Sequence, residues 1–244
     1  MTRPDSTTTH LVLVGGQLCT PRFWDEQRKG LARRAELHDF CPGEAPGERS
    51  VADAARRLLA TAPTRFAIAG HALGGFIALE VVRQAPGRVT HLALLGTNAE
   101  PDAPSAYARR MAYKRLAEAG QLEELIAERY AAVLHPALAA EPRYRDIVAT
   151  MARATGAERF LRQQDIVLGR PDSRPSLGAI RCPCVLIVGR EDRLGTVAQH
   201  EELARGIAQA RLHVIEDCGH FSPLEKPAEV TALLLEWLTS GHPA

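Results

Sequence analysis

The 244-residue sequence has no long hydrophobic run and no excess of one charge. No apolar stretch approaches the ~18 residues that a membrane-spanning helix needs, and the polar segment 1–10 does not resemble a signal peptide. Thirty Lys and Arg residues stand against 29 Asp and Glu residues, for a formal net charge of +1. We therefore expect a protein whose partners are neither nucleic acids nor membranes, because both favour a concentrated basic surface.

Cysteine is also sparse, and the five cysteines are spread along a chain long enough to bury a large core without disulfides. They are typical of reduced thiols in a cytoplasmic protein. Cys182 and Cys184 have no matching Cys/His pair elsewhere, so the sequence favours packing over metal binding there. A phosphate-binding glycine loop, a dinucleotide fingerprint and a zinc motif are absent as well. We predict no cofactor and no metal.

The sequence does contain an alternation of short apolar runs and helical patterns. The predicted strands cover residues 10–14, 36–40, 65–69, 90–95, 184–188 and 212–215. The predicted helices of this part cover residues 21–31, 50–62, 73–84, 196–207 and 227–239. Strands that alternate with helices imply an α/β fold, in which helices cover both faces of a mostly parallel sheet.

A different pattern fills residues 98–169, where Ala, Arg, Glu and Leu recur at helical spacing and no strand is predicted. Four helix breakers divide this segment into roughly four helices: Gly120, Pro136, Pro142 and Gly156. The sequence thus predicts a core domain of residues 1–97 and 170–244, with a helical lid of residues 98–169 inserted after the fourth strand. Such a lid would cover the carboxyl ends of the strands, where open α/β sheets bind ligands.

The segment GHALGG, residues 70–75, joins a predicted strand to a predicted helix. This context and the glycine spacing are typical of a nucleophile elbow, which lifts a catalytic side chain above the sheet on a strained turn. The nucleophile itself is missing, because position 72 holds alanine. Taken alone, the segment is as compatible with a simple tight turn as with a catalytic one.

Two later residues favour the catalytic interpretation. Asp192 follows the strand at 184–188 and His220 follows the strand at 212–215, so a parallel sheet brings both to the edge where the elbow lies. Either residue alone is more typical of a loop cap or a packing histidine. Together with Ala72 they follow the chain order of nucleophile, acid and base. Glu191, beside Asp192, is a rival for the acid.

At these segments the chain resembles the α/β-hydrolase family, in particular its small, lidded esterase and enol-lactonase members. The segments that carry the resemblance span nearly the whole chain: LVLVGGQLCTPRFW, FAIAGHALGGFIALE, VLIVGREDRLG and EDCGHFSPLEKPAEV. The resemblance implies an α/β-hydrolase fold, with about six strands rather than eight because the N-terminal segment is short. It also favours Asp192 over Glu191 as the acid, because Asp192 matches the family's G-x-x-D position.

The same resemblance implies roles for further residues. The backbone N–H groups of Gln17 and Leu73 are expected to form an oxyanion hole, and Gly16, His71 and Phe221 are expected to contact the substrate. The implied partner is a small-molecule ester or lactone, and the implied protein is a monomer or a homodimer without a cofactor. The sequence alone does not separate an esterase from a lactonase, a thioesterase or a carbon–carbon hydrolase.

Alanine at position 72 leaves three hypotheses open. A methyl group cannot attack a carbonyl, and loss of the nucleophile in a comparable triad lowers turnover by a factor on the order of 10⁶. In the first hypothesis the chain is an inactive, engineered form of a serine hydrolase, in which Ala72 traps ligand. In the second it is a natural ligand-binding protein, and in the third a lyase that uses His220 and Asp192 as a general base. The intact surroundings of the elbow favour the first.

The predicted lid gives limited information about the substrate. Its aromatic and methionine side chains are expected mostly in helix packing, with a few lining an apolar pocket. Its arginines are interspersed with acids and are typical of a solvated surface. One arginine that faces the pocket would bind a substrate carboxylate, but the sequence does not select it. Residues 163–165 and 170–175 are interpreted as the turn or hinge through which the lid returns to the sheet.

Overall fold

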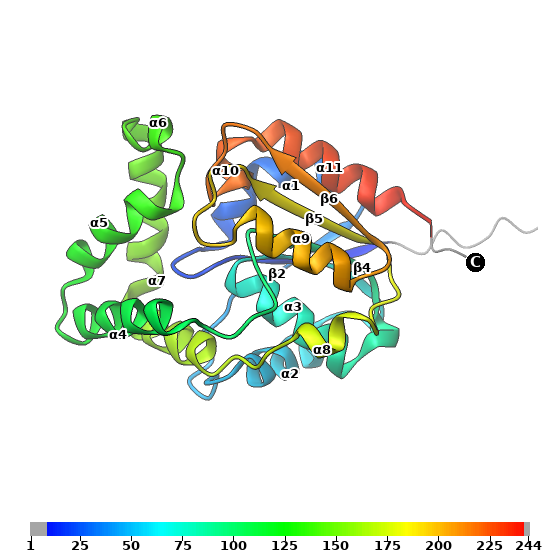
Figure 1. The fold of residues 1–244 in the computed structure, drawn as a ribbon, viewed down its shortest axis with the longest axis horizontal. Helices are drawn as coiled ribbons and strands as arrows, with labels where there is room; N and C mark the ends of the chain where they lie inside the picture. Colours follow the sequence, from blue (N-terminus) through cyan, green and yellow to red (C-terminus); the bar gives the residue numbers. More distant parts are fainter. Residues whose placement is uncertain (1–8, 242–244) are drawn as a thin grey trace, which may run out of the picture.

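The computed structural model describes residues 9–241, in which six strands form a single sheet. The strands are β1 (His10–Val14), β2 (Glu36–Phe40), β3 (Phe66–His71), β4 (Val89–Leu95), β5 (Cys184–Gly189) and β6 (Ala210–Ile215). Their order is β2-β1-β3-β4-β5-β6, and all neighbouring pairs are parallel. The predicted six-stranded parallel sheet is therefore confirmed (Figure 1).

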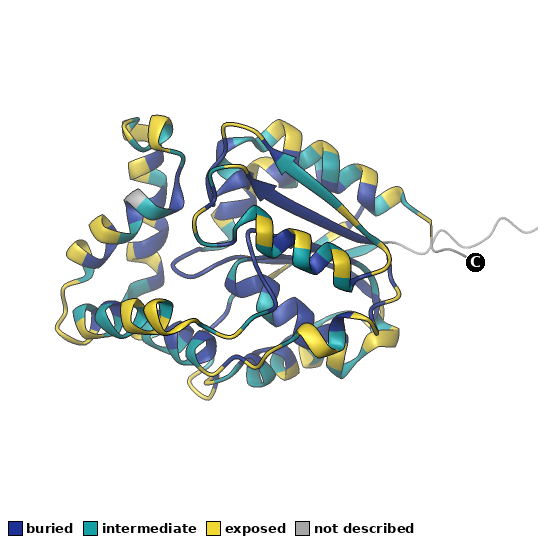
Figure 2. Ribbon diagram, in the orientation of Figure 1, coloured by how far each residue is buried: buried dark blue, intermediate teal, exposed yellow. Residues whose placement is uncertain are grey.

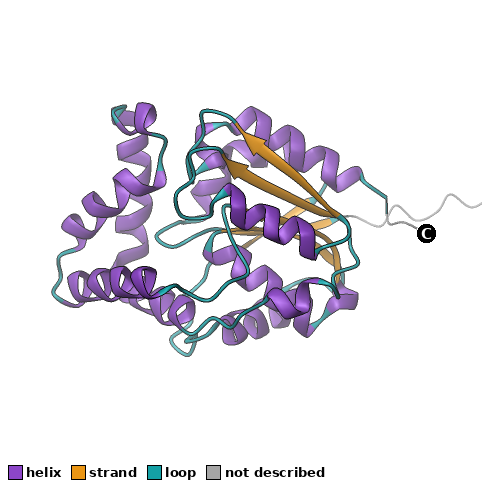
Figure 3. Cartoon of the chain, in the orientation of Figure 1, coloured by secondary structure: helices purple, strands orange, loops and turns teal. Residues whose placement is uncertain are grey.

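Helices cover both faces of this sheet (Figure 3). One face carries α1 (Asp25–Leu31) and α11 (Pro227–Thr239), which pack against each other. The other face carries α2 (Val51–Thr61), α3 (Leu73–Gln84) and α9 (Val197–Gly206). Short helices occupy the connections: η1 (Pro21–Trp24), η2 (Pro86–Arg88), α8 (Arg174–Leu177) and α10 (Ser222–Glu225).

The inner strands are apolar on both sides because both faces of the sheet are covered. In β1, Val12 and Val14 belong to the apolar cluster on the α2, α3 and α9 side, whereas Leu11 and Leu13 belong to the cluster on the α1 and α11 side. Figure 2 shows β5 as a continuously buried strand. This double burial explains why these strands appear in the sequence as short unbroken apolar runs.

The strand order reverses at β1, because β2 pairs with one side of β1 and β3 pairs with the other. At such a switch point the loops that follow the two strands diverge, and a crevice opens outside the carboxyl ends of the strands. The loop after β1 and the turn after β3 both lie at this crevice. The fold therefore places the predicted oxyanion loop beside the predicted elbow.

Between β4 and β5 the chain forms the short α8 and, before it, four further helices: α4 (Pro104–Glu118), α5 (Leu122–Val133), α6 (Pro136–Ala139) and α7 (Pro142–Leu168). We call these four helices the helical insertion. They lie beside the carboxyl ends of the strands (Figure 1). Gly156 interrupts the helical backbone as predicted, because it has the non-helical angles φ 75° and ψ 165°. The range of α7 therefore contains two helical parts that meet at a kink.

Gln163 and Gln164 were interpreted as hinge residues, and this interpretation was wrong. Both are buried within α7, which continues to Leu168. The amide of Gln163 accepts a hydrogen bond from the N–H of Leu18 and donates one to the carbonyl of Pro42, each at 3.0 Å. A polar side chain that fastens a helix to the core is indistinguishable in sequence from one in a loop.

All five cysteines are free, and Cys41 is the only one that is not buried. Burial raises the pKa of Cys19 to about 12 and that of Cys182 to about 11, so both thiols stay protonated at neutral pH. Between residues 9 and 241, no helix is both long enough and apolar enough to cross a membrane.

Candidate active site

Ala72 lies on a strained turn between β3 and α3. Its backbone angles are φ 50° and ψ −109°, outside the helical and extended regions that residues with a Cβ favour. Strain of this kind costs on the order of 1–3 kcal/mol and persists only where the surroundings hold it. The N–H of Ala72 donates to the carbonyl of Leu95, and the carbonyl of Ala72 accepts from the N–H of Gly75 and the hydroxyl of Thr97, each at 2.9 Å.

The glycines around Ala72 are required by the close approach of neighbouring chain segments. A Cβ on Gly70 would overlap the carbonyl oxygen of Gly74, and a Cβ on Gly74 would overlap that of Val14. A Cβ on Gly75 would lie 2.6 Å from the side chain of Thr97. The glycine spacing found in the sequence therefore has a steric cause in the structure.

Asp192 and His220 are joined by a hydrogen bond of 2.8 Å between Oδ2 and Nδ1. Oδ1 of Asp192 accepts the N–H groups of Leu194 at 2.8 Å and of Gly195 at 2.9 Å. Burial opposes ionisation of Asp192, but His220 and the two N–H groups stabilise the carboxylate and lower its pKa below the usual range. Asp192 is thus held as an anion that orients the imidazole.

Glu191, the rival acid, points elsewhere. Its Oε2 accepts the N–H of Cys218 at 2.8 Å, and the imidazole of His220 is bonded to Asp192 instead. Glu191 belongs with His135 and Asp217 to a group of metal-ligating side chains whose ligand atoms lie within 4.8 Å of one another.

His71 is fully buried between the elbow and the loop that carries His220. Its Nε2–H donates to the backbone carbonyl of His220 at 2.9 Å, and its Nδ1 has no hydrogen-bond partner. Burial lowers the pKa of His71 to about 3, so the ring is neutral at physiological pH. The two rings lie 4.6 Å apart between centroids. We infer that His71 braces the loop of His220 as an uncharged side chain.

The sequence analysis missed Glu225, which fastens the same loop. The buried carboxylate accepts the N–H groups of Gly219 at 2.8 Å, Phe221 at 2.9 Å and His135 at 3.0 Å. Burial raises the pKa of Glu225, against the three N–H groups, which lower it. Because His135 follows α5, this carboxylate ties the helical insertion to the histidine loop. A glutamate four residues after Phe221, which becomes the last residue of α10, was the available sequence signal.

A cavity of about 380 Å³ opens between the carboxyl edge of the sheet and the insertion. Seven of the eight predicted site residues line it: Gly16, Gln17, His71, Ala72, Leu73, His220 and Phe221. Asp192 is hidden behind His220, and its side chain has no exposed surface. The structure therefore brings all the predicted residues together at one cavity.

Both predicted oxyanion donors belong to segments that lie next to Ala72. Leu73 is the first residue of α3, so its N–H has no partner within the helix. The loop of Gln17 approaches closely, since a Cβ on Gly16 would lie 3.0 Å from Nδ1 of His71 and 3.4 Å from the Cβ of Ala72. The arrangement suits a carbonyl oxygen held between two backbone N–H groups.

Charged side chains from the insertion and the loops after β4 and α7 complete the cavity wall. Five arginines line it, namely Arg109, Arg110, Arg129, Arg170 and Arg174, against two acids, Glu100 and Asp102. Asp102 pairs with Arg110 and Arg170, each at 2.6 Å. The interpretation of residues 170–175 as a hinge was incomplete, because Arg170 is a buried part of this wall. The cavity carries an excess of positive charge that the sequence did not reveal.

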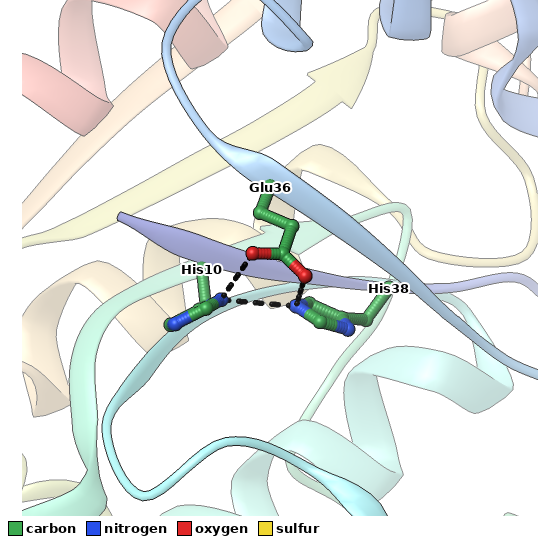
Figure 4. A group of neighbouring side chains, drawn as sticks. All are labelled: His10, Glu36 and His38. Atoms are coloured by element: carbon green, nitrogen blue, oxygen red, sulfur yellow. Dashed lines mark hydrogen bonds and ion pairs between the residues drawn. The ribbon is translucent and has the colours of Figure 1, made fainter. Parts of the chain in front are cut away.

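A second group of side chains that could bind a metal ion consists of His10, Glu36 and His38 (Figure 4). It lies on β1 and β2, away from the carboxyl ends of the strands. Nδ1 of His10 lies 3.1 Å from Nε2 of His38, and the two rings lie 3.5 and 3.7 Å from the carboxylate oxygens of Glu36. The sequence analysis did not identify this group, because the pairing of β1 with β2 creates it.

Comparison with known proteins gives consistent results. The sequence pattern of the alpha/beta hydrolase family matches residues 11–233. The chain is 30% identical to the pimeloyl-[acyl-carrier protein] methyl ester esterase of Aromatoleum aromaticum, over 99% of this chain and 100% of that protein. A thermophilic esterase from Thermogutta terrifontis, solved with malate bound, superposes with a TM-score of 0.85 at 25% identity, over 97% of this chain and 92% of that one. The enol-lactonase of Burkholderia xenovorans LB400 shares the fold, with a TM-score of 0.86 at 20% identity, over 98% and 94% of the two chains.

Proposed function

Because the chain belongs to the alpha/beta hydrolase family, we propose that its site is built to hydrolyse a small carboxylic ester or lactone. The observation that carries this proposal is the strained turn at Ala72, which shares a cavity with the Asp192–His220 pair. A turn of this shape lifts the side chain of its central residue above the sheet, where a nucleophile meets its substrate. The ester-cleaving relative of Aromatoleum aromaticum supports the same reaction class.

In this proposal the working enzyme carries serine at position 72. The serine oxygen attacks the carbonyl, and Nε2 of His220 takes its proton and returns it to the leaving group. Asp192 fixes the imidazole tautomer, because its Oδ2 accepts the Nδ1–H of His220. The N–H groups of Gln17 and Leu73 stabilise the oxyanion, each by roughly 3 kcal/mol in comparable enzymes.

The alanine form is then an inactive variant that binds substrate without cleaving it, consistent with an engineered replacement. Alanine removes the attacking oxygen but fits the strained turn, because its side chain is a single methyl group. A natural binding protein and a lyase remain the competing hypotheses. Neither needs a nucleophile at the top of this turn.

The test is the substitution Ala72→Ser, assayed with p-nitrophenyl butyrate and a γ-lactone. We expect a gain in kcat between about 10⁴-fold and 10⁶-fold, because the nucleophile supplies most of the turnover in a comparable triad. The matched control adds His220→Ala to Ala72→Ser and should return the rate to that of the alanine form. A folded Ala72→Ser protein that cleaves no ester, lactone or thioester would contradict the proposal.

A further inference from the structure

Arg129 stands out among the cavity arginines because it has no acidic partner. It extends from α5 with its guanidinium over the rings of Tyr113 at 5.3 Å and Phe160 at 5.7 Å. In the described part of the chain, no carboxylate lies within ion-pair distance of it. Burial, and to a lesser degree Arg110, lower the pKa of Arg129 to about 10, so it remains a cation at neutral pH. Arg129 is partly buried, and a charge that is partly withdrawn from water and lacks a counterion is costly, which indicates a missing anion.

The other cavity arginines are accounted for. Arg110 and Arg170 share Asp102, and Arg174 pairs with Asp172 at 2.7 Å. Arg109 also has no ion pair among residues 9–241, but it is exposed, so water solvates it. Among the arginines of the cavity wall that the structure describes, only Arg129 is both partly buried and without an ion pair.

A second unmet donor lies in the same wall. Oε1 of Gln17 accepts a hydrogen bond from Arg110 at 3.1 Å, which fixes the orientation of the amide, and its buried Nε2 has no partner. Gln17 and Arg129 also line a small side cavity of about 20 Å³, whose other lining residues are apolar. Arg129 and Gln17 therefore place two unmet donors side by side in this wall, and these donors call for an acceptor that carries negative charge.

We propose that Arg129, with the amide of Gln17, forms a subsite for a free carboxylate on the substrate. The proposal rests on the function proposed above and narrows its substrate class to esters or lactones that retain a carboxylate group, such as monoesters of dicarboxylic acids. A guanidinium binds a carboxylate through two parallel hydrogen bonds, which gives both affinity and orientation. The subsite lies on the insertion side of the cavity, and the reacting carbonyl lies on the sheet side.

The binding test uses the alanine protein as it exists. Monomethyl glutarate should bind at least tenfold more tightly than dimethyl glutarate in isothermal titration calorimetry, because only the monoester carries a carboxylate that the guanidinium of Arg129 can bind. Arg129→Met should remove this preference, and Arg129→Lys should retain part of it. The matched control Arg153→Met changes an exposed arginine of the insertion outside the cavity and should leave this preference unchanged. Equal binding of the two esters, or equal losses in Arg153→Met and Arg129→Met, would overturn the subsite.

The activity test uses the Ala72→Ser background and compares kcat/KM for the p-nitrophenyl monoester of glutaric acid with that for p-nitrophenyl valerate. Arg129→Met should lower the ratio of the two kcat/KM values by a factor between about 10 and 100. The whole change should come from the charged ester, with the rate for p-nitrophenyl valerate unchanged. If the serine protein cleaves both esters and Arg129→Met changes neither rate, the subsite fails and the hydrolase proposal stands. If it cleaves neither ester and the alanine protein still binds the monoester through Arg129, the hydrolase proposal fails and the subsite stands.

A different observation carries a second inference, at the other end of the sheet. The ligand atoms of His10, Glu36 and His38 converge from neighbouring strands, with separations of 3.1, 3.5 and 3.7 Å (Figure 4). Ligand atoms around a tetrahedral zinc ion, each about 2.0–2.1 Å from the metal, lie about 3.3 Å apart. Glu36 and His38 are two residues apart on β2, so their side chains point to the same face of the sheet. His10 on β1 is the register partner of Glu36.

We infer that these three side chains bind a divalent transition metal such as Zn²⁺, with a fourth position left to water. Two imidazoles and one carboxylate are a common zinc ligand set. The three side chains are partly exposed, with 29% to 58% of their surface accessible, so an ion has access from solvent. The site would be structural, because binding joins the edge strand β2 to β1 far from the cavity.

The test titrates the metal-free protein with Zn²⁺ by calorimetry and with Co²⁺ by visible absorption. We expect one equivalent to bind, with the absorption of a tetrahedral cobalt site, and at least tenfold weaker binding in His38→Gln and in Glu36→Gln. The matched control is Asp217→Asn, which disrupts the other potential ligand group, formed by His135, Glu191 and Asp217. Loss of binding in Asp217→Asn alone, or unchanged binding in His38→Gln and Glu36→Gln, would overturn the inference.

Discussion

The sheet with its loops and the helical insertion meet at one cavity, yet different interactions hold them in shape. At the elbow, the backbones of Gly70, Gly74 and Val14 lie too close for any side chain to fit between them. In the insertion, a small apolar cluster around Phe160 and exposed ion pairs such as Arg153–Glu123 at 2.7 Å join the helices. The proposed reaction geometry thus depends on backbone contacts, whereas the proposed substrate choice depends on side chains that are easily exchanged.

We expect the largest difference in stability from a glycine-to-alanine substitution made once in each region. Gly70→Ala forces a Cβ onto the carbonyl of Gly74 and should destabilise the protein by more than about 3 kcal/mol. Gly120→Ala, in the insertion, meets open space but adopts φ +74°, so it should cost about 1 kcal/mol. Urea denaturation of both variants measures the difference. Equal losses of stability would show that close packing does not distinguish the two regions.

A pH titration should also report on the sheet region. Burial lowers the pKa of His71 to about 3 and that of His200 to about 4, whereas unfolded histidine titrates near 6.5. The unfolded chain therefore binds more protons below pH 6.5, and the stability present above this pH is lost as the pH falls.

Each of these histidines should remove roughly 2 kcal/mol from the free energy of unfolding by pH 5. Urea denaturation at pH 7.5 and pH 5.0 measures the sum. His200→Gln should reduce the difference by about half, because one of the two titrating groups is gone. An unchanged difference in this variant would refute the assignment to His200.

The contact between the two regions can be weakened at Glu225. In Glu225→Gln, an amide NH₂ faces backbone donors where a carboxylate oxygen accepted them, at a cost of about 1–3 kcal/mol. Hydrogen exchange should show faster exchange at the amides of His135 and Phe221. The control Glu229→Gln changes an exposed glutamate of the same segment and should have no effect on either measurement. Unaltered exchange at His135 in Glu225→Gln would mean that this carboxylate does not fasten the insertion.

The smallest effect is expected at the surface of the insertion. Arg153 and Glu123 form an exposed ion pair, and such pairs contribute little because water screens both charges. Arg153→Gln should leave the urea midpoint unchanged within error and should not alter the preference for the monoester. A clear loss of stability would show that surface ion pairs hold the insertion together more strongly than its apolar cluster does.

The sequence predicted the sheet well because its patterns are local. The bounds of β1, β2 and α11 agree with the predicted ranges, since an apolar run ended by glycine or proline depends little on distant contacts. The predicted helix at residues 50–62 begins with an equally local contact, because the side chain of Ser50 caps α2 by accepting the N–H of Asp53 at 3.1 Å. The elbow was predicted for the same reason, because steric exclusion leaves glycine at fixed spacings.

The insertion was harder to predict because its decisive contacts are distant in sequence. Gly156 predicts the kink in α7, but not that α7 packs against α4 and α5, because those contacts join residues far apart in the sequence. The sequence also gave no means to choose among the arginines. Whether Arg129 has an acidic neighbour depends on how α4, α5 and α7 pack against one another. The hydrophobic periodicity of the sequence does not indicate this packing. For the same reason the role of Glu225 was missed.

The turn at Ala72 keeps its unusual backbone conformation without the hydroxyl oxygen that a serine at this position would present to a substrate. Alanine and serine differ there by one oxygen, and neither the hydrogen bonds of the turn nor the surrounding glycines involve that atom. If the proposed function is correct, one substitution at position 72 decides whether the protein only binds a ligand or also hydrolyses it. The packing around the turn is the same in both forms. The alanine protein would then bind ligands with the selectivity of the enzyme. It could therefore be used to isolate the true substrate from a mixture.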